Sequence, residues 1–136
     1  MNMPVGLVLL APLSVGEMAD KIAILRIKSV RIEDPAKLVH VRRELAALEQ
    51  AFAPALAGAA PQLAAHLARL QDINEKLWTI EDDIRACERV GDFGETFVAL
   101  ARSVYLTNDE RARVKLAINI AAGSAYQEQK SYSPLA

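Results

Sequence analysis

Polar and charged side chains that could do chemistry recur at helical spacing in three segments. One group holds the positions i, i+4, i+7 and i+11 of a single segment, which places them on one side of a helix. These residues are Asn74, Trp78, Glu81 and Arg85. The other two groups are Lys21, Lys28 and Arg31 with Ile24 among them, and Arg102, Tyr105 and Asn108. If the three groups face one another, they form either an ion-pair network that fixes helix register or a pocket for a small anion.

The residues alone leave both alternatives open. A candidate binding pocket would use the face of Trp78 for stacking. The charges of Lys28, Arg85 and Arg102 would bind the anion. Its full lining would be Lys21, Lys28, Asn74, Trp78, Glu81, Arg85, Arg102, Tyr105 and Asn108. The network is favoured, because structural ion pairs are common and no second signal singles out a ligand. In a network, loss of Lys28 or Arg102 would destabilise the fold, whereas in a pocket it would not.

Acidic, histidine and serine residues give no pattern of a metal or catalytic centre. The run Glu81, Asp82 and Asp83 fans around its helix, whereas a hard cation needs carboxylates that converge. His40 and His66 are far apart and have no recurring ligand spacing. No serine lies in a nucleophile-elbow context and no glycine-rich loop resembles a phosphate cradle. The sequence therefore predicts no catalytic residue, no metal and no cofactor.

Composition indicates one ordinary globular domain over residues 1–136. Hydrophobic residues make up 52% and charged residues 24%, and the net charge is −1. A near-neutral chain argues against nucleic acid as the partner. The lone Cys87 has no partner for an intrachain disulfide, which suits a reducing compartment, so we expect a cytoplasmic protein.

The apolar start of the chain predicts an extended arm. Residues 1–13 contain two prolines and lack the basic region and long apolar core of a signal peptide. Pro12 keeps Ala11 out of the helical region, so residues 5–12 should be extended, or form a short strand, and lie across the helices. No stretch reaches the ~18 apolar residues that a membrane span needs.

Helix signals predict a mainly all-α protein of about five helices. Ser14 with Glu17 forms a capping box, Asp34 precedes Pro35, and Gly91 and Gly123 stand where helices should end. A second capping box, Thr107 with Glu110, predicts another helix start near Asn108. The expected helices cover residues 15–32, 35–52, 62–89, 95–106 and 108–122, followed by a tail at 124–136.

Apolar residues in the segment 62–89 mark it as the central helix. The seam follows a 3,4 alternation through Leu63, His66, Leu70, Ile73, Leu77, Ile80, Ile84 and Cys87. The segment 35–52 carries a similar seam, so it should pair with the first helix as an antiparallel hairpin. We expect this hairpin to pack on the central helix.

Residues 14–25, 74–85, 97–112 and 128–132 together resemble an uncharacterised bacterial family of unknown function. The matching residues include Asp20, Lys21, Asn74, Trp78, Glu81, Asp82, Arg102, Tyr105, Asn108 and Lys130 to Tyr132. The resemblance implies a small all-helical protein associated with glycosyltransferase and tetratricopeptide proteins, and it implies no activity. We therefore expect a non-catalytic helical adaptor or assembly domain, linked to cell-surface polysaccharide synthesis, with a protein partner or a second copy. The alternative is a small-anion-binding protein or a metal-independent enzyme that uses the pocket around Trp78.

Overall fold

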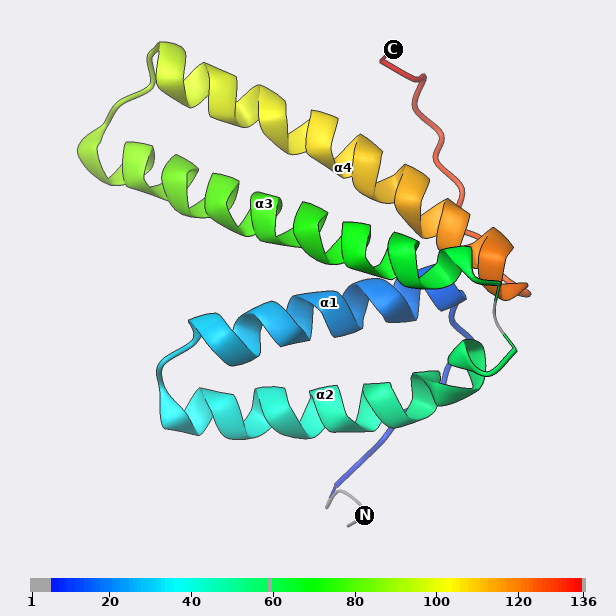
Figure 1. The fold of residues 1–136 in the computed structure, drawn as a ribbon. Helices are drawn as coiled ribbons and strands as arrows, with labels where there is room; N and C mark the ends of the chain where they lie inside the picture. The colour runs from blue at the N-terminus through cyan, green and yellow to red at the C-terminus, as the bar shows by residue number, and fades with distance from the viewer. Residues whose placement is uncertain (1–5, 59, 136) are drawn as a thin grey trace.

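Four helices in two antiparallel hairpins make up the fold (Figure 1). The structure, a computed structural model, describes residues 6–58 and 60–135. The helices are α1 (Val15–Arg31), α2 (Pro35–Leu56), α3 (Gln62–Val90) and α4 (Glu95–Ala122). The expected all-α class is confirmed, and no strand occurs in the described residues. The hairpins α1/α2 and α3/α4 meet where α1 begins and α4 ends, and they diverge toward the α3–α4 turn (Figure 1).

The first hairpin is bounded by the caps that the sequence predicts. Ser14 Oγ accepts a hydrogen bond from the Glu17 backbone N–H at 3.1 Å, which starts α1. Asp34 Oδ1 accepts one from the Ala36 N–H at 3.0 Å, and Pro35 occupies the first turn of α2. The two helices reverse direction over Ile32 to Asp34 because each end is satisfied locally.

The end of α2 differs from the prediction. The helix was expected to stop near Phe52, before Pro54, but it continues through Pro54 to Leu56. Proline removes one backbone hydrogen bond. Here Phe52 is buried against the core and holds the last turns of α2 in place. Tertiary packing therefore outweighs the local penalty.

The prediction of five helices is wrong by one, because the expected fourth and fifth helices are one continuous α4. The capping box at Thr107 does not start a new helix. Thr107 is buried in mid-helix, and neither glycine nor proline interrupts the chain between Glu95 and Ala122. A continuous α4 of 28 residues matches the 29 residues of α3, so the two pack along their length. Pairing with a long neighbour thus overrides a local start signal.

The hydrophobic core lies where the two hairpins meet, at the end opposite the α1–α2 and α3–α4 turns (Figure 1). Its buried members come from the first half of α1, the last turns of α2, the first half of α3 and the last half of α4. They are Ala19, Ile22, Phe52, Leu63, Leu70, Ile73, Val114 and Ile118. Helix α1 contacts each of the other three helices, so it is the element through which the hairpins join. The expected packing of the first hairpin on the long helix α3 is therefore confirmed.

The N-terminal arm is not packed across the helices as expected. Residues 7–13 form no regular structure, and Leu7, Leu9 and Leu10 are 88%, 82% and 94% exposed. Residues 1–5 of the expected arm lie outside the described part of the chain. Among the helices that the structure describes, none has the length and apolar character needed to cross a membrane.

Candidate functional site

A buried carboxylate links three helices beside the core. Asp20 on α1 is only 1% exposed. Arg111 of α4 grips it with two nitrogens, with Nε donating to Oδ1 at 2.8 Å and Nη2 pairing with Oδ2. Asn74 Nδ2 of α3 donates to the same Oδ1 at 2.9 Å. Side chains from two other helices thus donate hydrogen bonds to the carboxylate. A charged group that is buried away from water needs such partners.

Arg111 is held in turn by its own helix. Its Nη1 donates to Asn108 Oδ1 at 3.3 Å, one turn earlier on α4. The hydrogen bond with Asp20 raises the pKa of Arg111 above its ordinary value, and Glu17 adds to the effect. The guanidinium is therefore fixed in direction, and its side chain remains 27% exposed.

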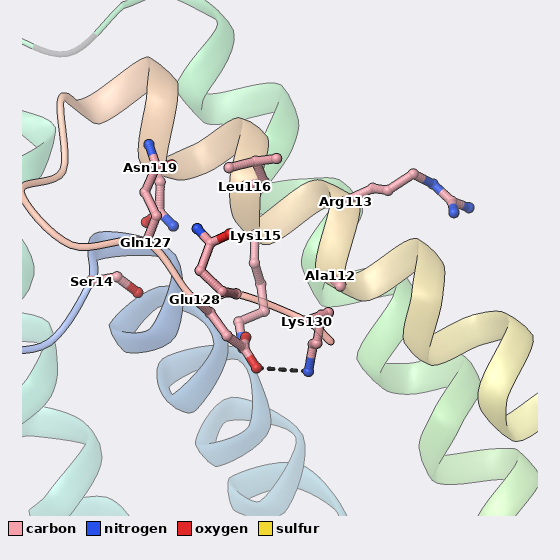
Figure 2. Close-up of a pocket in the computed structure, with 10 residues that line it drawn as sticks. Ser14, Ala112, Arg113, Lys115, Leu116, Asn119, Gln127, Glu128 and Lys130 are labelled. Carbon is pink, nitrogen blue, oxygen red and sulfur yellow. Dashed lines mark hydrogen bonds and ion pairs between the residues drawn. The ribbon is translucent and has the colours of Figure 1, made fainter. Parts of the chain in front are cut away.

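A second set of ion pairs joins α1, α4 and the C-terminal tail. Lys115 Nζ lies 2.7 Å from Glu17 Oε2 and 3.2 Å from Glu128 Oε2. The other Glu128 oxygen, Oε1, is 2.6 Å from Lys130 Nζ. Figure 2 shows Lys115 and Lys130 converging on Glu128, whereas Arg113 points away. We call Glu17, Asp20, Arg111, Lys115, Glu128 and Lys130 the charged cluster.

The two lysine amines change the pKa of the Glu128 carboxylate. Hydrogen bonding from Lys130 lowers the pKa of Glu128 below its ordinary value, and Lys115 lowers it further. A depressed pKa means that these contacts stabilise the tail above the ordinary carboxyl pKa, and that the stabilisation is lost as the pH falls through the lowered value. Attachment of the tail should therefore weaken in acid.

The start of α1 is bonded directly to the end of α4. The Gly16 N–H donates to Asn119 Oδ1 at 2.6 Å, and the Val15 N–H donates to Ser124 Oγ at 3.1 Å. Two orphan donors of the helix N-terminus are thus satisfied from another element. This contact brings Glu17 and Asp20 within reach of Lys115 and Arg111.

The close approach at Gly16 predicts a cost for any side chain there. A Cβ at this position would lie 2.5 Å from the Lys115 carbonyl oxygen and 3.0 Å from Asn119 Oδ1. Because the first of these is backbone, α1 and α4 would have to separate. We expect Gly16→Ala to lower the free energy of unfolding by about 1–3 kcal/mol, as measured by urea denaturation. Gly94→Ala, at an exposed helix start, is the control, and equal losses in both variants would contradict the expectation.

Two adjoining pockets open over the charged cluster. One has a volume of about 390 Å³ and the other about 340 Å³, and both are lined by Ala112, Lys115, Glu128 and Lys130. The first also includes Ser14 and residues 127–129 (Figure 2), and the second includes Glu17, Asn108, Arg111 and Tyr132. Their size is in the range of small-molecule sites. The charged side chains that line the pockets can form charge-assisted hydrogen bonds with a ligand.

The structure places the nine predicted pocket residues in different surroundings. Asn74 and Asn108 are brought together through Asp20 and Arg111. Glu81 and Arg85 form an exposed i,i+4 pair at 3.8 Å along α3. Lys21, Arg102 and Tyr105 are exposed, and Lys28 and Trp78 are partly buried. Trp78 lines neither of the two pockets, so binding around it stays a prediction.

The predicted pocket includes none of the six residues of the charged cluster. Two of them, Asp20 and Lys130, stand only among the residues that match the family. A signal was present, because Glu17 and Asp20 are one turn apart on α1, and Arg111 and Lys115 are one turn apart on α4. Two such stripes of opposite charge can pair across a helix interface. Within the described residues, no three or more His, Cys, Asp or Glu side chains lie so that they could hold a metal ion together.

The exposure of Arg102 leads to a simple test of the predicted network. Its side chain is exposed on α4, so its removal leaves no buried charge. We expect Arg102→Ala to change the free energy of unfolding by no more than about 0.5 kcal/mol. Thermal unfolding followed by circular dichroism would measure this. A loss of several kcal/mol would instead show that Arg102 belongs to an ion-pair network.

The chain belongs to the family of unknown function DUF6165, whose family model matches residues 10–136. This match confirms the resemblance noted from the sequence. Comparison with curated proteins and with solved structures gives no match.

Proposed function

We propose that the chain is a non-catalytic helical adaptor or assembly domain that docks on a protein partner through its apolar arm, residues 6–13. The supporting observation is the exposure of Leu7, Leu9 and Leu10, which point into solvent instead of covering the helices. Burying apolar surface is favourable by roughly 25 cal/mol per Å². The four successive apolar residues Leu7, Val8, Leu9 and Leu10 are each more than half exposed and therefore favour association.

The sequence of the arm suggests how it would dock. If the arm binds as an extended strand, successive side chains point to opposite faces, so Leu7 and Leu9 would lie on one side and Val8 and Leu10 on the other. Both faces are apolar, as in strands that are covered on two sides. Pro12 lacks a backbone N–H and would end the pairing. The arm thus fits the exposed edge of a sheet in another protein.

A second copy of this chain is the less favoured partner. The described residues contain no strand, so for strand pairing two copies could offer one another only their arms. A two-stranded ribbon of that kind is marginally stable in water. We therefore favour a different protein that carries the sheet.

The cellular setting is part of the same proposal. Cys87 is a free, buried cysteine, which suits the reducing cytoplasm. The resemblance drawn from the sequence associates such proteins with glycosyltransferases. We accordingly propose that the partner belongs to cell-surface polysaccharide synthesis.

The proposal is tested by changing the arm without touching the helices. Leu10→Gln removes an apolar side chain that is 94% exposed, and Val30→Gln is the matched control at 83% on α1. The wild-type chain and both variants are immobilised, and a purified candidate glycosyltransferase is passed over each. We expect the wild type and Val30→Gln to retain it and Leu10→Gln to lose it. Equal retention by all three would exclude the arm, and light scattering that shows a dimer abolished by Leu10→Gln would favour a second copy instead.

A further inference from the structure

The tail places a carboxylate where an external anion could sit. The two oxygens of Glu128 each face a lysine amine, Lys115 on one side and Lys130 on the other. We propose that this position is a binding site for a small phosphate monoester, and that Glu128 is a built-in occupant which the phosphate replaces. This proposal is independent of the arm and of the proposed docking function.

Positive charge surrounds the position once Glu128 is set aside. Arg111, Lys115 and Lys130 line the pocket of about 340 Å³, and Glu17 is the remaining acidic residue in its lining. Asp20 is buried, does not line the pocket, and offsets the charge of Arg111 through their ion pair. The net charge around the position stays positive, so it attracts an anion. The attraction is stronger for an anion with two charges.

The amine of Lys115 is held in position without a ligand. Its side chain is 12% exposed and is held at 2.7 Å by Glu17, a contact that does not involve the tail. Lys115 would therefore keep its place if Glu128 turned away. Binding to a group that is already ordered costs less conformational entropy than binding to a free lysine.

Glu128 is the most exposed of the three carboxylates in the charged cluster. Its side chain is 41% exposed and belongs to a tail without helical structure. Exposed ion pairs are weak because water competes for both partners. By contrast, Asp20 is enclosed and gripped by Arg111 and Asn74. A change of rotamer at Glu128 is thus the easiest way to open the site.

The donors around the position favour phosphate over a carboxylate. Asn108 and Tyr132 line the same pocket as the three basic side chains, so amide and hydroxyl donors are available as well as amines. A phosphate group has three acceptor oxygens and carries up to two charges, so it can use several of these donors at once. The pocket volume leaves room for a small organic group attached to the phosphate.

Titration with inorganic phosphate, followed by nuclear magnetic resonance at constant ionic strength, tests the site. Glu128→Gln removes the competing charge, and we expect it to bind phosphate about tenfold more tightly than the wild type. Adding Lys130→Met to Glu128→Gln should reverse the gain. Lys130 lies on the tail, so this variant should not disturb the helices.

The control is Arg113→Gln in the Glu128→Gln background. Arg113 lines the adjoining pocket of about 390 Å³ but not the pocket of about 340 Å³ that holds the proposed site, and its side chain points away from Glu128 (Figure 2). We expect it to bind phosphate as Glu128→Gln does. Equal affinity in the wild type and Glu128→Gln would overturn the proposal, as would an equal loss from Arg113→Gln and Lys130→Met. Vesicles that contain phosphatidic acid form a separate arm. Tighter binding of Glu128→Gln to these vesicles than to a soluble sugar phosphate would assign the phosphate to a lipid headgroup.

Discussion

Replacing Arg111 with methionine is expected to lower the free energy of unfolding by about 3 to 5 kcal/mol. The change keeps most of the apolar stem but removes both nitrogens that hold Asp20. The carboxylate, 1% exposed, would then keep only the Asn74 amide as a partner. A buried charge without a counter-charge is strongly unfavourable. Urea denaturation at neutral pH measures the loss.

A matched substitution two residues away provides the control. Arg113 is exposed on the same helix, so Arg113→Met should change stability by no more than about 0.5 kcal/mol. Adding Asp20→Asn to Arg111→Met should recover part of the loss, because the buried group is then neutral. If Arg111→Met proved as stable as Arg113→Met, the buried ion pair would have no role in holding the helices together.

Replacing Leu70 with alanine is expected to cost about 2 to 5 kcal/mol. Leu70 has no exposed surface and lies in the core with Ile73 and Ile118. Its truncation leaves a cavity where the two hairpins meet, and close-packed neighbours relax only partly. Chemical denaturation again gives the measurement.

The control for this core variant is Leu116→Ala, since Leu116 is a leucine of α4 that is 43% exposed. Its loss should be clearly smaller than that of Leu70→Ala. Similar losses at the two positions would mean that the core is not centred where the two hairpins meet.

Much of the fold could be predicted because its signals are local. The seam residues Leu63, Leu70 and Ile73 are buried as their spacing indicates. The Ser14 and Asp34 side chains cap their helices as expected, because each bond joins residues at most three positions apart. The Glu17 carboxylate, which was expected to complete the capping box, pairs with Lys115 instead. Periodicity and capping act within one or two turns, so a single sequence carries them.

The errors arise where distant packing overrides a local signal. The capping pair Thr107 and Glu110 stays inside α4 because α3 offers a partner surface along its whole length. Pro54 stays inside α2 because Phe52 is anchored in the core. In both places the decisive contact comes from another helix, which local spacing does not reveal.

The candidate site was only partly predictable for the same reason. Asn74 was identified because it lies on a regular polar stripe, and Asn108 because it belongs to a polar group with Arg102 and Tyr105. Their connection depends on Asp20 and Arg111, which are 91 positions apart in the chain. The role of the tail depends likewise on the contact between Glu128 and Lys115. No regular spacing within the tail predicts this contact.

The bonds between α1 and α4 have a consequence for biosynthesis. The contacts Asp20–Arg111, Glu17–Lys115 and Val15–Ser124 join residues 91, 98 and 109 positions apart. A chain that emerges from the ribosome N-terminus first has made α1 long before it makes these partners. Until α4 appears, Asp20 has no counter-charge from that helix and must remain hydrated, so α1 cannot take its final place. The α1/α2 hairpin is therefore expected to reach its final packing only after nearly the whole chain has been synthesised.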